Sequence, residues 1–128
     1  MTVAYVDTSC VLAVALDEPG SAALARRLSS IDTLISVNLL EAELRAALAR
    51  ERVEFDAAAL AGISWIVPGR PLSDEIAHVI AAGPLRGADT WHLAAALYVA
   101  EEHGELAFLT LDARQRSVAR ALGFRAHE

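Results

Sequence analysis

Short apolar runs alternate along the chain with longer stretches in which apolar residues recur every three or four positions. The short runs predict β-strands, and the helical spacing predicts amphipathic helices. Strands are expected at Val3–Val6, Thr33–Ser36, Ile63–Val67 and Leu106–Thr110. Helices are expected at Ser9–Leu16, Gly20–Ile31, Asn38–Arg50, Asp56–Ala61, Ser73–Ala82, Asp89–Glu102 and Asp112–Leu122, with Gly123 as the stop signal after the last one.

Helices separate successive predicted strands, and this order predicts an α/β fold with a mainly parallel sheet covered on both faces. No repeat, low-complexity tract or change of composition divides the 128 residues, so residues 1–128 are expected to form one domain. In open α/β sheets, ligands bind beyond the carboxyl ends of the strands, near the point where the strand order reverses. Polar residues that directly follow a strand are therefore the first candidates for a site.

Charge and composition narrow the function. The formal net charge is −6 and all eleven basic residues are arginine, which argues against a protein that grips nucleic acid over a broad basic surface. A local acidic metal site remains possible. The longest apolar runs are far shorter than the roughly 20 residues of a membrane span, and the single Cys10 cannot form an internal disulfide. We therefore expect a soluble, cytoplasmic protein with no membrane partner and with Cys10 in the core.

Three aspartates stand at the ends of predicted elements. Asp7 directly follows the first strand and lies between two apolar runs. Desolvating an isolated carboxylate costs on the order of several kcal/mol, so Asp7 requires a cap, an ion partner, a metal or a surface edge. Asp112 follows the strand Leu106–Thr110 in the same way, and Asp89 opens a helix. For Asp89 and Asp112, helix N-capping alone would be a sufficient explanation.

The helix predicted at Asn38–Arg50 carries two acids in different surroundings. Glu41 has Arg45 four residues later, which predicts a surface ion pair. Glu43 is instead flanked at helical spacing by apolar and small residues, so we expect it to face a covered cleft and to need a cation.

A divalent cation would balance these acids if they met. Two like charges about 4 Å apart repel by roughly 4 kcal/mol at an effective dielectric constant near 20, so clustered carboxylates would take up protons unless a cation joined them. Mg²⁺ prefers oxygen ligands and can activate a water that attacks a phosphodiester. The chain contains no paired histidine motif typical of a zinc site.

Four segments, in order, resemble a PIN-domain ribonuclease of the VapC toxin family: YVDTSCVLAVAL, ISVNLLEAELRAALAR, RGADTWHLAAALYVA and FLTLDARQRSVARALGF. The resemblance covers essentially the whole chain, and four ordered acidic motifs are far more specific than any one alone. It implies a PIN-like three-layer α/β/α fold and a Mg²⁺- or Mn²⁺-dependent endoribonuclease that hydrolyses RNA. It also implies that metal binding and catalysis depend on Asp7, Glu43, Asp89 and Asp112.

The same resemblance implies partners. Such toxins are held inactive by a cognate VapB-type antitoxin, whose C-terminal segment occupies a groove near the active site, and they commonly form homodimers. The middle segment VEFDAAALAGISWIVPGRPLS matches no signature of the family, so the loops that choose the RNA substrate are not identified by the resemblance.

Supporting roles are expected for several neighbours of the acids. Ser9 and Thr110 stand beside motif acids and could orient a water or a carboxylate, while Arg86 could contact an RNA phosphate. Thr8 could cap the first helix. His92, alone in an apolar helix, is expected to be packed or hydrogen-bonded rather than to act as a base.

Two other classes of protein remain as alternatives. A haloacid-dehalogenase-like phosphatase also begins with a strand that ends in Asp, but it needs a second acid two residues later, where this chain has Ser9. A non-catalytic α/β binding module would leave Asp7, Asp89 and Asp112 as unrelated helix caps. Convergence of the four acids in one pocket separates these alternatives from the nuclease.

Overall fold

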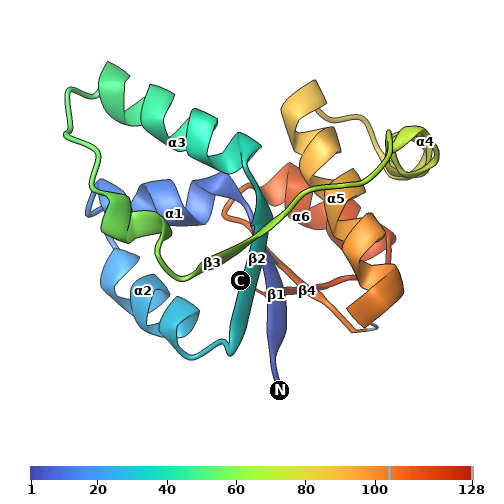
Figure 1. Cartoon of the computed structure of the whole chain (residues 1–128), viewed down its shortest axis with the longest axis horizontal. Coiled ribbons are helices and arrows are strands. Elements are labelled where there is room, and N and C mark those ends of the chain that lie inside the picture. The colour runs from blue at the N-terminus through green and yellow to red at the C-terminus, as the bar shows by residue number, and fades with distance from the viewer. Residues whose placement is uncertain (104, 128) are drawn as a thin grey trace.

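Neighbouring residues of the strand β1 (Val3–Val6) enter two separate cores on opposite faces of the sheet. Tyr5 packs in one core with apolar residues of α4 (Ser73–Ala82), α5 (Gly87–His103) and α6 (Ala113–Ala121). Ala4 and Val6 pack in the other core with residues of α1 (Thr8–Ala15), α2 (Ser21–Ser29) and α3 (Leu39–Arg50). Figure 1 shows these two groups of helices on the two sides of the sheet, which confirms the three-layer α/β/α prediction.

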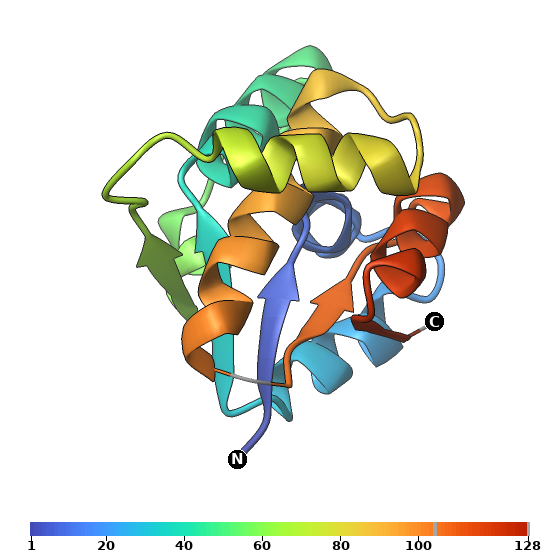
Figure 2. The same cartoon turned by 90° about the vertical axis from the view of Figure 1, so that its right-hand side faces the viewer.

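The computed structural model describes residues 1–103 and 105–127, and in that part of the chain five strands form one all-parallel sheet. Besides β1, the strands are β2 (Thr33–Val37), β3 (Ile63–Ile66), β4 (Ala107–Leu109) and β5 (Arg125–His127), and a short 3₁₀ helix, η1 (Ala57–Leu60), precedes β3. Their order across the sheet is β3-β2-β1-β4-β5. Figure 2 shows β1 between β2 and β4, with α4 crossing above the carboxyl ends of the strands.

The predicted elements are confirmed with small shifts at their ends and one omission. The sequence interpretation missed β5, because only three residues after Gly123 form it. The left-handed conformation of Gly123, with φ of 95°, ends the preceding helical segment as predicted. Helix α5 begins at Gly87 rather than at Asp89, so Asp89 lies inside the first turn and the capping interpretation of this residue is wrong.

The strand order reverses at the centre of the sheet. From β1 the chain moves outward through β2 to β3, and it later returns to β4 on the other side of β1 before ending at β5. The carboxyl ends of β1 and β4 therefore mark the switch point at which open α/β sheets bind their ligands. Asp7 directly follows β1 and Thr110 directly follows β4.

Burial agrees with the assignment of Cys10 to the core, where burial raises the pKa of its thiol to about 12. None of the helices in residues 1–103 and 105–127 has the length and hydrophobicity needed to cross a bilayer.

Candidate functional site

A pocket of about 490 Å³ lies between α1, α3 and the start of α5, at the carboxyl ends of the central strands. All four acids predicted from the sequence line it, and they come from four different elements or their caps: Asp7, Glu43, Asp89 and Asp112. Ser9 and Arg86 line the same pocket, and so does Arg50, which the sequence interpretation did not single out. The fold thus brings together acids that are as much as 105 positions apart in the sequence, from position 7 to position 112.

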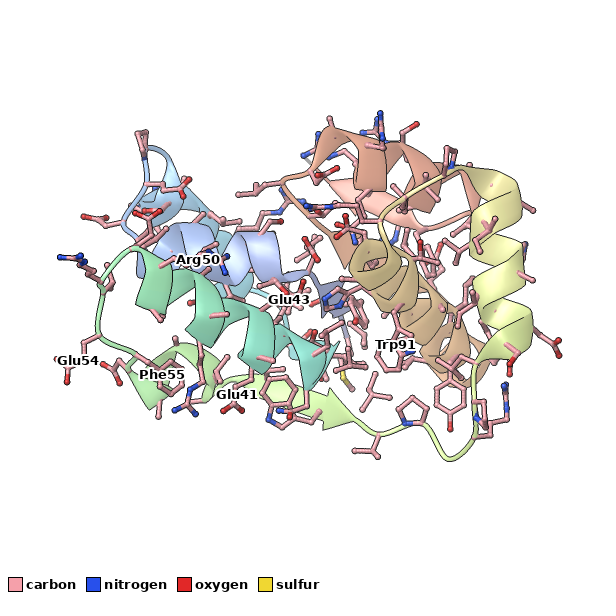
Figure 3. The ribbon with its side chains drawn as sticks, turned by 90° about the horizontal axis from the view of Figure 1, so that it is seen from above. Glu41, Glu43, Arg50, Glu54, Phe55 and Trp91 are labelled. Atoms are coloured by element: carbon pink, nitrogen blue, oxygen red, sulfur yellow. The ribbon has the colours of Figure 1, made fainter. Side chains whose placement is uncertain are left out.

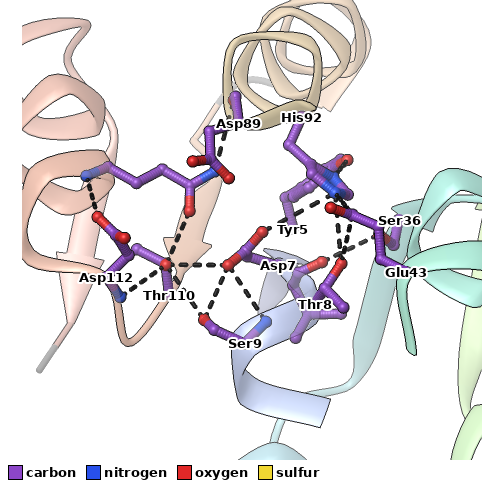
Figure 4. A network of polar contacts seen from close by, with 12 residues as sticks. Tyr5, Asp7, Thr8, Ser9, Ser36, Glu43, Asp89, His92, Thr110 and Asp112 are labelled. Carbon is purple, nitrogen blue, oxygen red and sulfur yellow. Dashed lines mark hydrogen bonds and ion pairs between the residues drawn. The ribbon is translucent and has the colours of Figure 1, made fainter. Parts of the chain in front are cut away.

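The two carboxylate oxygens of Asp7 have different surroundings, and the residue both caps a helix and lines the pocket. It is the N-cap of α1, and its Oδ2 accepts hydrogen bonds from the Ser9 amide at 3.3 Å, the Ser9 hydroxyl at 2.8 Å and the Thr110 hydroxyl at 3.1 Å. Its Oδ1 lies 3.9 Å from Nε2 of His92, beyond hydrogen-bond distance. Figure 4 shows Asp7 at the centre of this network. Capping and ligand binding are therefore compatible at this residue.

Asp112, which follows β4, likewise caps a helix and lines the pocket. It is the N-cap of α6, and its Oδ1 accepts a hydrogen bond from the Gln115 amide at 2.8 Å, so the capping interpretation is confirmed here. The residue is exposed where it lines the pocket. On the other wall, Oδ2 of Asp89 lies 3.4 Å from Nε of Arg86, whose side chain is 86% exposed.

A buried hydrogen-bond chain holds Glu43. Oε1 of Glu43 accepts from the Thr8 hydroxyl at 2.8 Å and lies 2.6 Å from Nε2 of His92, which is fully buried. Nδ1 of His92 lies 2.6 Å from the hydroxyl of Tyr5. Burial raises the pKa of Tyr5 well above its usual value, so the phenol keeps its proton and can donate it to Nδ1. Nε2 then carries the proton that His92 donates to Glu43.

These hydrogen bonds decide the predictions made from the sequence for His92 and Thr8. His92 is packed and hydrogen-bonded, as predicted. Thr8 does not cap α1, because Asp7 occupies the cap position and the Thr8 hydroxyl binds Glu43 instead. The Glu41–Arg45 surface ion pair is confirmed at 3.0 Å.

Thr110 links Asp7 to the last helix. Its hydroxyl lies within hydrogen-bond distance of Asp7 Oδ2 and of Gln115 Oε1, and it accepts from the Asp112 amide at 3.1 Å. Gln115 is fully buried, and its Nε2 donates to the carbonyl of Asp89 at 3.4 Å. Thr110 and Gln115 therefore link the carboxylate of Asp7 to the backbone of Asp89 and Asp112.

Three residues of this site were missed from the sequence: Tyr5, Gln115 and Arg50. Gln115 stands three residues after the Asp112 cap, which is a capping-box spacing and could have drawn attention to it. Arg50 stands seven residues after Glu43, two turns along the same helix face. No comparable signal marks Tyr5, whose position in a strand reads as ordinary core.

The surroundings of the pocket shift the pKa values of Glu43 and Asp89 in opposite directions. Partial burial raises the pKa of Glu43, but the hydrogen bonds from His92 and Thr8, together with the charge of Arg86, more than offset this effect, and the pKa is lowered. Burial raises the pKa of Asp89, and the charges of Asp7 and Asp112 raise it further against the opposing effect of Arg86. Asp7 and Asp112 are thus close enough for their charges to raise the pKa of Asp89.

The opposite shifts predict opposite pH responses of stability in EDTA. Glu43 has a pKa below its ordinary 4.5, so its charge stabilises the fold above that pH and the stabilisation is lost as pH falls through the lowered pKa. Asp89 has a pKa above its ordinary 3.8, so its charge destabilises the fold as pH rises through the raised pKa.

Urea unfolding at several pH values tests both signs. Glu43→Gln should lose most stability near neutral pH and little in acid, whereas Asp89→Asn should gain stability near neutral pH and be indifferent in acid. The same trend in both variants would contradict the described electrostatics.

The donors of the pocket fit a hard divalent cation. Four carboxylates supply oxygen ligands, while the nearest imidazole nitrogen is engaged by Glu43. Among the side chains that the structure describes, those of residues 1–101 and 105–126, no three from His, Cys, Asp or Glu are arranged as a set that could hold a metal ion on their own. Mg²⁺ does not need such a set, because it is usually held by one or two carboxylates and keeps several waters.

Comparison with known proteins agrees with this site. The family model described as the PIN domain matches residues 4–121, a range that includes all four acids. Neither the curated proteins nor the solved structures give a significant match. The chain therefore belongs to the PIN-domain family, whose members are generally nucleases that use divalent metal ions.

Proposed function

We propose that the protein is a Mg²⁺- or Mn²⁺-dependent endoribonuclease that acts in the cytoplasm as the toxin of a type II toxin–antitoxin pair of the VapBC kind. The observation that supports this proposal most strongly is the pocket in which Asp7, Glu43, Asp89 and Asp112 meet at the switch point of the sheet. Pairing of β1 with β4 accounts for the meeting of the two caps Asp7 and Asp112, but it does not account for Glu43 and Asp89, which cap no helix. Glu43 is not at a cap at all, and its partners hold it toward the other acids.

Each residue has a defined part in the proposed reaction. Asp7 and Asp112 each use one oxygen to cap a helix, and their remaining oxygens would hold the cation together with Asp89. Glu43, fixed by His92 and Thr8, would accept a proton from the attacking water or hold it in place. A bound divalent cation supplies a water of lowered pKa and offsets the charge of the phosphodiester. Arg86, exposed at the rim, would bind a phosphate oxygen.

The environment of Ser9 argues against the phosphatase alternative. A haloacid-dehalogenase-like site needs a second carboxylate two residues after Asp7, whereas Ser9 donates its hydroxyl proton to Asp7 at 2.8 Å. A non-catalytic binding module predicts no effect of Mg²⁺ on RNA.

Cleavage of RNA by the purified protein tests the proposal. Single-stranded RNA of mixed sequence should be cut internally in Mg²⁺ or Mn²⁺, and EDTA should abolish the cutting. Glu43→Gln should lower the rate by roughly 100-fold if the carboxylate acts in proton transfer. Glu41→Gln, on the outer face of the same helix, is the matched control and should cleave like the parent. Cleavage that persists in EDTA would contradict the proposal.

The proposed partners require a separate experiment. Co-expression with the small protein encoded beside it should yield a complex that survives gel filtration and suppresses cleavage. The complex is expected to contain an even number of copies of this chain, in agreement with a homodimer. Recovery of the chain only as a free monomer under these conditions would contradict both partner assignments while leaving the nuclease proposal standing.

A further inference from the structure

One face of α3 forms a wall of the pocket that extends well beyond the acids. Glu43, Ala46, Ala47 and Arg50 recur along this face at helical spacing, and all four line the pocket. Figure 3 shows Glu43 and Arg50 on the same side of α3, opposite Glu41. Seven residues of helix separate Glu43 from Arg50 by about 10 Å along the axis. The wall therefore runs from an acid at one end to a cation at the other.

The residues between these ends leave space. Ala46 and Ala47 carry only a methyl group, and Leu12 of α1 lines the same pocket. We call this part of the pocket, bounded by Leu12, Glu43, Ala46, Ala47 and Arg50, the α3 trough. Ala46 is exposed although it faces the pocket, so the trough is open to a ligand from solvent.

Arg50 has no acidic partner among the side chains that the structure describes, in contrast to Arg45 and Arg70. Arg45 is paired with Glu41 and lies over the ring of Phe55 at 4.5 Å, and Arg70 is bound to Glu75. With the described side chains of residues 1–101 and 105–126, Arg50 forms no ion pair. Its guanidinium is thus available to an anion that enters the trough.

The charge of the whole molecule makes such a local cation significant. The chain has a net charge of −6, and a polyanion that approached the acids would be repelled unless cations flanked them. Arg86 stands at one side of the acids and Arg50 at the far end of the trough. Two cations on the two sides of the acids could each bind one of the phosphates that flank the phosphodiester to be cleaved.

We propose that the α3 trough seats the segment of single-stranded RNA next to the cleaved bond and that Arg50 binds a flanking phosphate. The inference rests on the proposed ribonuclease function and adds to it the path of the strand. Arg50 holds the substrate and takes no part in proton transfer, so its loss should act on binding and KM rather than on kcat.

Two single variants, Arg50→Ala and its control Arg26→Ala, test whether Arg50 binds an RNA phosphate. Arg26 is an exposed residue of α2 outside the pocket, so Arg26→Ala removes the same charge elsewhere. Arg50→Ala should raise KM for mixed-sequence single-stranded RNA in Mg²⁺, and the Kd for the same RNA in EDTA, by roughly tenfold. The slope of log Kd against log salt should fall by about 0.7, the value for one phosphate contact on a single strand. Arg26→Ala should change neither quantity by more than twofold.

A second pair of variants tests whether RNA occupies the space of the α3 trough. Ala46 and Ala49 are both exposed residues of α3, but only Ala46 lines the trough. Ala46→Glu would fill the trough with a negative side chain, placed to pair with Arg50 one turn later. It should raise KM by at least roughly tenfold, by the same phosphate-contact argument, while Ala49→Glu cleaves like the parent. Melting temperatures of the two variants should agree, which excludes unfolding as the cause.

The outcomes separate this inference from the function on which it rests. If the parent protein binds and cleaves RNA, but each trough variant behaves like its control, the α3 trough is not the path of the strand and the nuclease function stands. If the parent neither binds nor cleaves RNA in Mg²⁺ or Mn²⁺, both proposals are overturned.

Discussion

Asp7→Asn should reduce RNA cleavage by roughly 100-fold or more, in the range seen when one electrostatic group of an active site is removed. The substitution keeps the size of the side chain and an oxygen that can accept from the Ser9 amide and hydroxyl. It removes the negative charge from Oδ1, the oxygen that the cap leaves unused. Because the charge of Asp7 also raises the pKa of Asp89, its removal relieves repulsion, and the metal-free variant should be at least as stable as the parent.

Asp56→Asn is the matched control for this experiment. Asp56 is the N-cap of η1 and accepts from the amide two residues later at 2.9 Å, as Asp7 does at α1, but it lies outside the pocket. Both variants should melt within a few degrees of the parent, and only Asp7→Asn should lose activity. Steady-state cleavage in Mg²⁺ and thermal melts in EDTA measure the two effects. Full activity of Asp7→Asn would remove Asp7 from the catalytic set.

His92→Ala should cost about 2–4 kcal/mol of unfolding free energy and most of the activity. The histidine is fully buried, so truncation leaves a cavity and deprives the buried Tyr5 hydroxyl of a partner. It also removes one of the hydrogen bonds to Glu43, which keeps the one from the Thr8 hydroxyl. Loss of stability and loss of cleavage should therefore occur together in this variant.

His78→Ala controls for the loss of a histidine, since His78 is an exposed residue of α4. It should change the unfolding free energy by no more than about 0.5 kcal/mol. Urea denaturation with an unchanged m-value measures both variants. A His92→Ala protein as stable as His78→Ala would contradict the buried chain from Tyr5 to Glu43.

The fold was largely predictable because its signals are local. Apolar runs and helical periodicity are properties of neighbouring residues, and they located four of the five strands and the six helices described here. The strand β5 was missed because it is only three residues long and contains Arg125 and His127. Such an edge strand depends on pairing with β4 rather than on its own pattern.

The part of the site that could be predicted from the sequence is the part formed by residues that directly follow neighbouring parallel strands. Asp7 and Asp112 follow strands that lie side by side in the sheet, so their convergence follows from the α/β pattern. Glu43 and Asp89 needed the resemblance between motifs, because nothing local shows which helix faces which. The hydrogen bonds that join Tyr5, His92 and Glu43 span up to 87 positions in the sequence. Only the folded structure reveals such contacts.

The measurement that tests the central claim most directly is anomalous X-ray diffraction from a crystal of the protein soaked in Mn²⁺. The claim is that Asp7, Glu43, Asp89 and Asp112 act as one metal-dependent site. It predicts an anomalous peak inside the pocket, bound directly to Asp7 and to at least one of the other three acids, and no such peak in an Asp7→Asn crystal grown in the same way. A pocket without a peak at saturating Mn²⁺, or a peak only at acids outside it, would contradict the claim.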